Sequence, residues 1–233
     1  MTVPTMTEPL VIAIDGPAGA GKSTVAQMLA RRLGLAYVDS GATYRAAALK
    51  VLESGVSLEN EEEIIRVVGS ADIRFAAGQP LPQVLLDGKD VTTKIRAMEV
   101  TRASSRVSQL PAVRQKLITL QRSLVKPPGV VMEGRDIGTV VFPAAALKIF
   151  LKADPEERAR RRVHQNEEQG RPSSLEKILA EISRRDQRDA ERQASPLVAA
   201  EDAAIIDSTG LSAEEVVEKV LELARKRNLT GLQ

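Results

Sequence analysis

Residues 16–23 read Gly-Pro-Ala-Gly-Ala-Gly-Lys-Ser and match the complete pattern G-x-x-x-x-G-K-[ST] of a phosphate-binding loop. The glycines leave backbone N–H groups free to point inward at phosphate oxygens. Lys22 has the reach to contact the β- and γ-phosphates of a nucleoside triphosphate, and the Ser23 hydroxyl can ligate Mg²⁺. The stretch therefore predicts a nucleoside triphosphate site.

The sequence on either side of this loop supports the prediction. Residues 10–14, Leu-Val-Ile-Ala-Ile, are typical of a short buried strand, which ends at Asp15. Residues 23–33 carry apolar side chains at helical spacing, and Gly34 ends that pattern. A strand, a glycine loop and a helix N-terminus in this order form an anion site. A glycine-rich turn that matches by chance is the alternative, and it is disfavoured because the motif and both neighbours agree.

The composition limits the classes of protein. The 233 residues, 43% of them apolar, suffice for one large domain or for a core with a small insert. A net charge of +2, 2% aromatic residues and no tryptophan argue against nucleic acid as a partner. The absence of cysteine excludes disulfides and fits a cytoplasmic location. No stretch approaches the roughly 18 apolar residues of a membrane span, and residues 1–9 read as a flexible leader.

The rest of the chain alternates short apolar runs with amphipathic segments. This order predicts a parallel sheet covered by helices on both faces, with ligands at the carboxyl ends of the strands. We expect a turn at Asp39-Ser40-Gly41 and a loop after the strand that ends at Glu133. The further predicted strands are 36–38, 129–133, 147–151 and 203–207, and the helices are about 44–52, 59–69, 95–109, 111–125, 155–169, 174–193 and 212–227.

Between residues 72 and 92 the period of the apolar residues changes to two. Residues 73–75 and 84–86 read as strands separated by a turn at 78–80. Asp87-Gly88 is a hairpin signal that leads to a third strand at 89–91. The segment therefore predicts a small antiparallel β insert.

Two segments place charged side chains near the ends of predicted strands. Arg45 follows one of these ends by about a helical turn and could reach an anion, although a solvated helix arginine is the alternative. Arg135-Asp136 comes directly after the strand at 129–133. A functional pair is favoured at such a position over a structural salt bridge within the loop.

Arginine is unusually frequent between residues 158 and 192. A solvated, salt-bridged helical hairpin explains most of these side chains. The excess over lysine nevertheless indicates bidentate phosphate recognition, and two helices joined at Gly170-Arg171-Pro172 could form a lid that keeps water from a γ-phosphate. The arginines are Arg158, Arg160, Arg161, Arg162, Arg171, Arg184, Arg185, Arg188 and Arg192.

No residue stands out as a strong general base. His164, the only histidine, lies in a charged helical segment and reads as a surface residue. Transfer of a phosphoryl group to a phosphate needs no such base, because the acceptor is already anionic. The sequence also lacks a convincing N-K-x-D motif for reading guanine, which counts against a GTPase.

Together these motifs resemble the bacterial cytidylate kinase family within the nucleoside monophosphate kinases. The similarity covers nearly all of residues 10–227, and the run Gly-Arg-Asp-Ile-Gly-Thr-Val-Val-Phe-Pro at 134–143 is highly specific. The resemblance implies an α/β fold with a P-loop NTPase core, the β insert and a helical lid, in one domain. The matching segments are 14–24, 39–45, 133–143, 184–189 and 207–209. The implied division is a leader at 1–9, a single P-loop kinase domain at 10–227 with a monophosphate-binding region at about 40–110 and a lid at about 155–192, and a tail at 228–233.

The resemblance also implies the activity and the site residues. The family phosphorylates CMP and dCMP with ATP and Mg²⁺ in pyrimidine nucleotide metabolism, and we expect a monomer without nucleic-acid or membrane partners. Ser23 would hold Mg²⁺, which is otherwise water-coordinated. The implied catalytic residues are Lys22, Arg135, Arg158 and Arg161. The ATP-binding residues would be Gly16, Pro17, Ala18, Gly19, Ala20, Gly21, Lys22, Ser23 and Thr24. The CMP-binding residues would be Ser40, Tyr44, Arg45, Ser105, Arg114, Arg135, Asp136, Arg185, Asp189 and Arg192.

The chemistry of cytosine agrees with this assignment. Its N4 amine is a donor, so a carboxylate at Asp136 would accept from cytosine and reject uracil, whose O4 is an acceptor. Three alternatives remain: another small-molecule kinase on the same core, such as a UMP, AMP or shikimate kinase; a non-catalytic nucleotide-dependent regulator or RNA-binding protein; and a GTPase switch.

Overall fold

A computed structural model describes residues 8–76, 82–168, 170, 173–192 and 195–229, which fall into two compact units. Unit 1 comprises residues 1–37 and 126–233, and unit 2 comprises residues 38–125. Most of the predicted leader and tail, the turn at 78–80, and Arg171 and Pro172 lie outside the described residues. No helix among the described residues is long and apolar enough to cross a membrane.

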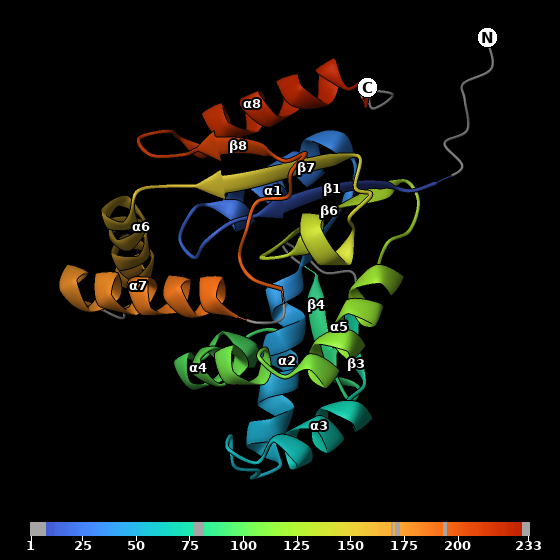
Figure 1. Ribbon diagram of the computed structural model, residues 1–233, viewed down its shortest axis with the longest axis vertical. Helices are drawn as coiled ribbons and strands as arrows, with labels where there is room; N and C mark the ends of the chain where they lie inside the picture. The colour runs from blue at the N-terminus through green and yellow to red at the C-terminus, as the bar shows by residue number, and fades with distance from the viewer. Residues whose placement is uncertain (1–7, 77–81, 169, 171–172, 193–194, 230–233) are drawn as a thin grey trace. The chain divides into compact units, whose positions relative to one another are not determined.

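Unit 1 is built on a five-stranded sheet of order β2-β6-β1-β7-β8, of which β6, β1, β7 and β8 are labelled in Figure 1. The pairs β1–β6, β1–β7 and β7–β8 are parallel, as predicted, and place Asp15 opposite Gly134. Strand β6 is buried along its whole length, which explains its continuous apolar run. The strands are β1 (Leu10–Asp15), β2 (Ala36–Asp39, which crosses into unit 2), β6 (Gly129–Gly134), β7 (Leu147–Lys152) and β8 (Ala204–Asp207).

Helices α1 (Lys22–Leu33) and α8 (Ala213–Lys226) cover one face of this sheet (Figure 1). Ile12 and Ile14, which alternate along β1, contribute to the core they share with the two helices. Ser212 caps α8 in a complete capping box. The apolar faces of α1 and α8 therefore explain why both helices pack against the sheet.

The other face carries a feature that the sequence prediction missed. We predicted a loop after β6, but Ile137–Val141 forms a π-helical turn, η2, that packs against β1 and β6. The turn is closed because Phe142 N donates to Ile137 O at 2.7 Å and Val141 N donates to Asp136 O at 3.1 Å. This single turn is too short for its periodicity to show in the sequence.

Helices α6 (Pro155–Glu168) and α7 (Leu175–Glu191) pack against each other in unit 1 (Figure 1). Their contact contains the buried side chains of Ala159, Ile178 and Ile182. The remaining surface of the pair is strongly charged, as the sequence predicted.

Unit 2 is centred on α2 (Ser40–Glu53), which packs against three other helices. Alanines along its buried face allow these helices to approach closely. The predicted antiparallel patch is confirmed, with Ile73 opposite Leu86. The other elements are α3 (Glu61–Ser70), β3 (Ile73–Ala76), β4 (Gln83–Leu86), β5 (Lys89–Asp90), η1 (Lys94–Arg96), α4 (Met98–Val107) and α5 (Pro111–Ser123).

Two predicted boundaries in unit 2 were wrong. The expected turn at Asp39-Ser40-Gly41 is absent, because Asp39 takes an extended N-cap conformation and α2 begins directly at Ser40. The single helix expected at 95–109 is divided, because Ala97 is extended with ψ 146° and separates η1 from α4. Helical spacing of apolar residues continues across such a break, so periodicity alone does not reveal it.

Candidate active site

The phosphate-binding loop lies between β1 and α1 and depends on glycine at defined positions. Gly16 has φ +146°, and a Cβ added there would lie 2.0 Å from Leu151 O. Gly21 has φ +89° and occupies the N-cap of α1. Both positions favour glycine because their φ angles are positive. At position 16 there is also no space for a side chain. The strand, the glycine loop and the helix α1 therefore follow one another in the order that the sequence predicted.

Lys22 is buried at the start of α1, with 6% of its surface exposed. Its Nζ donates to Pro17 O within the loop at 2.7 Å. The pKa of Lys22 is lowered to about 7, mainly by burial and secondly by the positive charge of Arg135. The negative charge of Glu133 raises this pKa, but not enough to bring it back to its usual value. An anionic phosphate would reverse this effect, since it would stabilise the charged ammonium.

Ser23 and Thr24 follow Lys22 on the first turn of α1, and both are exposed. Within the described part of the chain, no group of three or more His, Cys, Asp or Glu side chains could hold a metal ion. A single hydroxyl oxygen is a hard ligand of the kind that Mg²⁺ takes when phosphates and water supply the rest of its shell. The donor set at Ser23 fits that mode of binding.

Arg158 connects α6 to the phosphate-binding loop and to α7. It is 4% exposed, and its Nη1 donates to Ala18 O at 3.1 Å and to Asp186 Oδ2 at 2.6 Å. Its Nε donates to Ala153 O at 3.0 Å. The Arg158 side chain therefore contacts the loop and is held in place by three partners.

Arg161 approaches the same loop through Ser208, which follows β8. Its Nη1 donates to Ser208 Oγ at 3.0 Å, and its Nη2 donates to Ser208 O at 2.6 Å. The Ser208 hydroxyl in turn donates to Ala20 O of the loop at 3.1 Å. The structure thus brings both predicted lid arginines, Arg158 and Arg161, to the phosphate-binding loop.

A second group of predicted residues surrounds Asp189 on α7. Arg135 Nε donates to Asp189 Oδ2 at 3.0 Å, and the Nε atoms of Arg185 and Arg192 each lie 4.0 Å from a carboxylate oxygen of Asp189. Burial alone would raise the pKa of Asp189, but Arg135 and the other two arginines together hold it below its usual value. Four predicted residues therefore form one charged cluster: one directly after β6, two on α7 and one at the C-terminal end of α7.

Asp136 lies between this cluster and η2, and it is 4% exposed. The next two residues, Ile137 and Gly138, donate their backbone N–H groups to Asp15 at 2.8 and 2.7 Å. Burial raises the pKa of Asp15 to about 6 despite these two hydrogen bonds. The backbone directly after Asp136, the candidate for reading the base, is thus held by the buried carboxylate of Asp15.

Unit 2 carries the other predicted CMP residues. Arg45 Nη2 donates to Asp39 Oδ2 at 2.5 Å, and this pairing holds the pKa of Asp39 low although burial alone would raise it. The Arg114 guanidinium lies 5.4 Å from the centre of the Tyr44 ring. Ser40 is buried, whereas Ser105 is half-buried and accepts at its carbonyl oxygen from the Ser108 hydroxyl at 3.2 Å.

Comparison with known proteins identifies the relatives of this chain. The cytidylate kinase family model matches residues 12–226. A cytidylate kinase from Azotobacter vinelandii is 48% identical over 225 residues, which cover 96% of this chain and 98% of that protein. Another from Caldicellulosiruptor saccharolyticus is 51% identical over 217 residues, which cover 92% and 95%.

This chain belongs to the cytidylate kinase family. Membership makes it a nucleoside monophosphate kinase and confirms the resemblance seen in the sequence. A solved structure of an uncharacterized protein from Eubacterium ventriosum has a TM-score of 0.50 at 12% identity and covers 92% of this chain and 97% of that chain. Similarity at this level shows the fold alone.

Three residues of this cytidylate kinase family member interact with the site but were not predicted to belong to it. Asp15 contacts η2, Asp186 contacts Arg158, and Ser208 contacts Arg161. Asp15 and Ser208 each follow or end a strand at its carboxyl end, where the topology rule places ligands. Asp186 lies one helical turn before Asp189, within the segment 184–189 that resembles the family.

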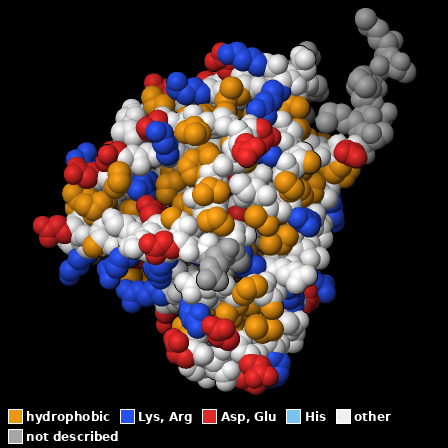
Figure 2. All heavy atoms as spheres, viewed as in Figure 1, with side chains coloured by type: hydrophobic (Ala, Val, Ile, Leu, Met, Phe, Trp, Pro, Cys, Tyr) orange, Lys and Arg blue, Asp and Glu red, His pale blue; other side chains and the backbone are white. Residues whose placement is uncertain are grey.

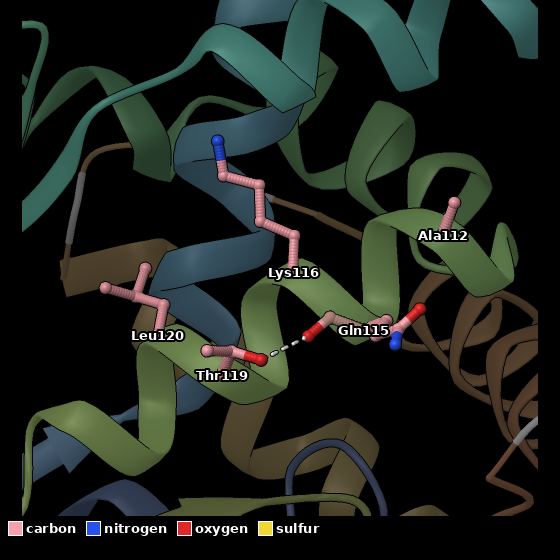
Figure 3. Close-up of a pocket in the computed structure, with 5 residues that line it drawn as sticks. All are labelled: Ala112, Gln115, Lys116, Thr119 and Leu120. Atoms are coloured by element: carbon pink, nitrogen blue, oxygen red, sulfur yellow. Dashed lines mark hydrogen bonds between the residues drawn. The ribbon is translucent and has the colours of Figure 1, made fainter.

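The pocket on α5 is separate from these groups. It has a volume of about 520 Å³ and contains none of the predicted site residues (Figure 3). Lys116, its charged member, points away toward α3, where Nζ donates to Val68 O, Gly69 O and Ala71 O at 2.6–2.8 Å. The ammonium group therefore stabilises the end of α3.

Acidic and basic side chains are interspersed over the visible face of the molecule (Figure 2). This mixture agrees with the net charge of +2.

His164 is exposed on α6, where its Nε2 lies 3.4 Å from Glu168 Oε1, as expected for a surface residue.

Proposed function

We propose that this family member, as a cytoplasmic monomer, transfers the γ-phosphoryl group of MgATP to CMP or dCMP and produces CDP or dCDP. One observation carries the proposal: unit 1 combines a phosphate-binding loop around buried Lys22 with two arginines held at that loop and a further arginine cluster at Asp189. Membership of the cytidylate kinase family supports the same activity.

On the ATP side, residues 16–24 would surround the phosphates with backbone N–H groups. Lys22 would exchange its bond to Pro17 O for the β- and γ-phosphates. Arg158 and Arg161 already lie at the loop and would stabilise charge on the transferring group. Ser23 would hold Mg²⁺, which supplies further neutralisation of the phosphate charge when bound.

On the acceptor side, the reaction requires positioning more than proton removal. An oxygen of the CMP phosphate forms a bond to the γ-phosphorus, and the bond from that phosphorus to the β-phosphate oxygen breaks to release ADP. Arg135 and Arg45 would hold the acceptor phosphate, with Arg192 in the phosphate region. Arg185 and Asp189 would contact the ribose.

Recognition of the base would depend on Asp136. Its carboxylate would accept a hydrogen bond from the cytosine N4 amine, while Ser105 and Arg114 would address the other polar atoms of the ring. Arg114 is 3% exposed, and its guanidinium lies 5.4 Å from the centre of the Tyr44 ring. Uracil would leave the Asp136 carboxylate facing an acceptor, which is the basis for its rejection.

The destination of the transferred phosphate tests this proposal. The protein is incubated with ATP labelled at the γ-phosphate and with CMP, and the products are separated. The proposal predicts label in the β-phosphate of CDP. Label in inorganic phosphate alone would indicate a hydrolase or a switch, and bound but unreacted ATP would favour the regulator alternative.

A further inference from the structure

Asp15 joins the end of β1 to the backbone that follows Asp136. One carboxylate oxygen accepts from Ile137 N at 2.8 Å and the other accepts from Gly138 N at 2.7 Å. Asp15 is 5% exposed, so these bonds are shielded from water. Both oxygens thus have a backbone donor from the two residues after Asp136.

The same turn is closed by its own backbone. Val140 N and Val141 N both donate to Asp136 O, at 2.9 and 3.1 Å. Asp136 itself has φ −147° and ψ 24°, outside the regular helical and strand conformations. Gly134 and Gly138 lie on either side of Asp136 and would leave this segment flexible on its own. The hydrogen bonds to Asp15 therefore restrict the conformations that Asp136 can adopt.

Lys148 supports the turn from the neighbouring strand. Its Nζ donates to Pro143 O at 2.5 Å and to Asp202 Oδ1 at 2.8 Å, which fixes the side chain. A Cβ added at Gly138 would lie 3.1 Å from Lys148 Cδ and 3.4 Å from Asp15 Oδ2. The turn is therefore held closely between Asp15 and Lys148.

We propose that Asp15 is a positioning residue for base selection, which acts by fixing η2 so that the Asp136 carboxylate meets the cytosine amine. The inference rests on the proposed function of Asp136. Asp15 itself does not touch the base. Its two oxygens are directed at backbone N–H groups, so its influence on specificity passes through the turn.

The variant Asp15→Asn tests this role with little change of size. Its amide can accept one of the two backbone hydrogen bonds, but its NH₂ group cannot accept the other. We expect the ratio of kcat/KM for CMP over UMP to fall about tenfold or more, with the KM for ATP retained, because small misplacements at a site are costly. An unchanged ratio, or an equal loss for both acceptors together with a raised ATP KM, would overturn the proposal.

Asp207→Asn is a matched control. Asp207 also ends a strand and accepts a backbone N–H bond, from Thr209 at 3.0 Å, but it lies at another turn. Its CMP-to-UMP ratio should remain that of the wild type. A ratio lowered as strongly as in Asp15→Asn would show that any strand-end carboxylate has this effect, and would contradict a specific role of Asp15.

A double variant separates this inference from the proposed function. Asp136→Ala alone should lower the CMP-to-UMP ratio, and adding Asp15→Asn should lower it no further, because both changes remove the same interaction. No effect of Asp136→Ala would overturn the base-reading role itself. An effect of Asp136→Ala combined with none from Asp15→Asn would overturn only the positioning role.

A second variant covers the case in which Asp15→Asn does not fold. Gly138→Ala disturbs the same turn from the side of Lys148 and keeps the Asp15 carboxylate. It should also lower the CMP-to-UMP ratio while retaining the ATP KM. A folded Gly138→Ala protein with the wild-type ratio would contradict the proposal.

Discussion

Arg135 Nε lies 3.0 Å from Asp189 Oδ2 and joins the end of β6 to α7. Arg185 and Arg192 also face this carboxylate. Asp189 therefore offsets the repulsion among three arginines that the proposed reaction requires close together. Its removal should affect both the stability of unit 1 and the binding of a nucleotide.

The variant Asp189→Asn should lose about 2 kcal/mol of unfolding free energy at pH 7, the scale of a hydrogen bond to a charged group. The folded-state pKa of Asp189 is depressed, so its stabilisation is present above the ordinary value of 3.8 and is lost as the pH falls through the folded pKa. Urea unfolding at several pH values would check this. A difference from wild type that grows below pH 4 would contradict it.

Lys22→Ala should reduce kcat by a factor of about 100 or more, because a preorganised cation at the transferring phosphate is lost. CMP binding should persist, as measured by calorimetry without ATP. Lys226→Ala, on the exposed end of α8, is the control and should retain full turnover. An unchanged kcat in Lys22→Ala would remove Lys22 from the mechanism.

ATP binding at pH 8 should take up about one proton. The pKa of Lys22 is about 7 in the free protein, so at pH 8 most molecules carry neutral Lys22, and the phosphates would restore its charge. Calorimetry in buffers with different ionisation enthalpies would measure the uptake. Lys22→Arg should show none, because its guanidinium stays charged. Heats independent of the buffer in the wild type would refute this prediction.

Gly16→Ala should destabilise the protein by about 3 kcal/mol or more, since the new Cβ would meet Leu151 O at 2.0 Å and the backbone has φ +146°. Gly34→Ala is the matched control. Gly34 also has positive φ, at +64°, but its Cβ would meet nothing within 4 Å, so a cost of about 1 kcal/mol is expected there. Equal melting temperatures for the two variants would contradict the steric argument.

The sequence predicted the features that leave a repeated or highly specific pattern. The loop at 16–23, the buried strands and the antiparallel insert each have such a pattern, and the structure contains all of them. Two features have no such pattern: the start of α2 at Ser40, directly after β2, and the turn η2. Each depends on the conformation of one or two residues. Local sequence does not fix such boundaries.

Candidate site residues could be named from the sequence where they belong to a motif. All four of Lys22, Arg135, Asp15 and Ser208 stand in recognisable segments, but the contacts of Asp15 and Ser208 are hydrogen bonds to residues more than 120 positions away. Periodicity and spacing do not contain such long-range pairings. Their roles emerge only when the strand ends are brought together by the sheet.

The most direct measurement is ADP release from MgATP with CMP, dCMP, UMP, AMP and shikimate offered separately. Our account predicts rapid release with CMP and dCMP, and far slower release with the other three acceptors. Release that is as fast with UMP, AMP or shikimate, or that requires no acceptor, would contradict the claim that this protein phosphorylates cytidylates.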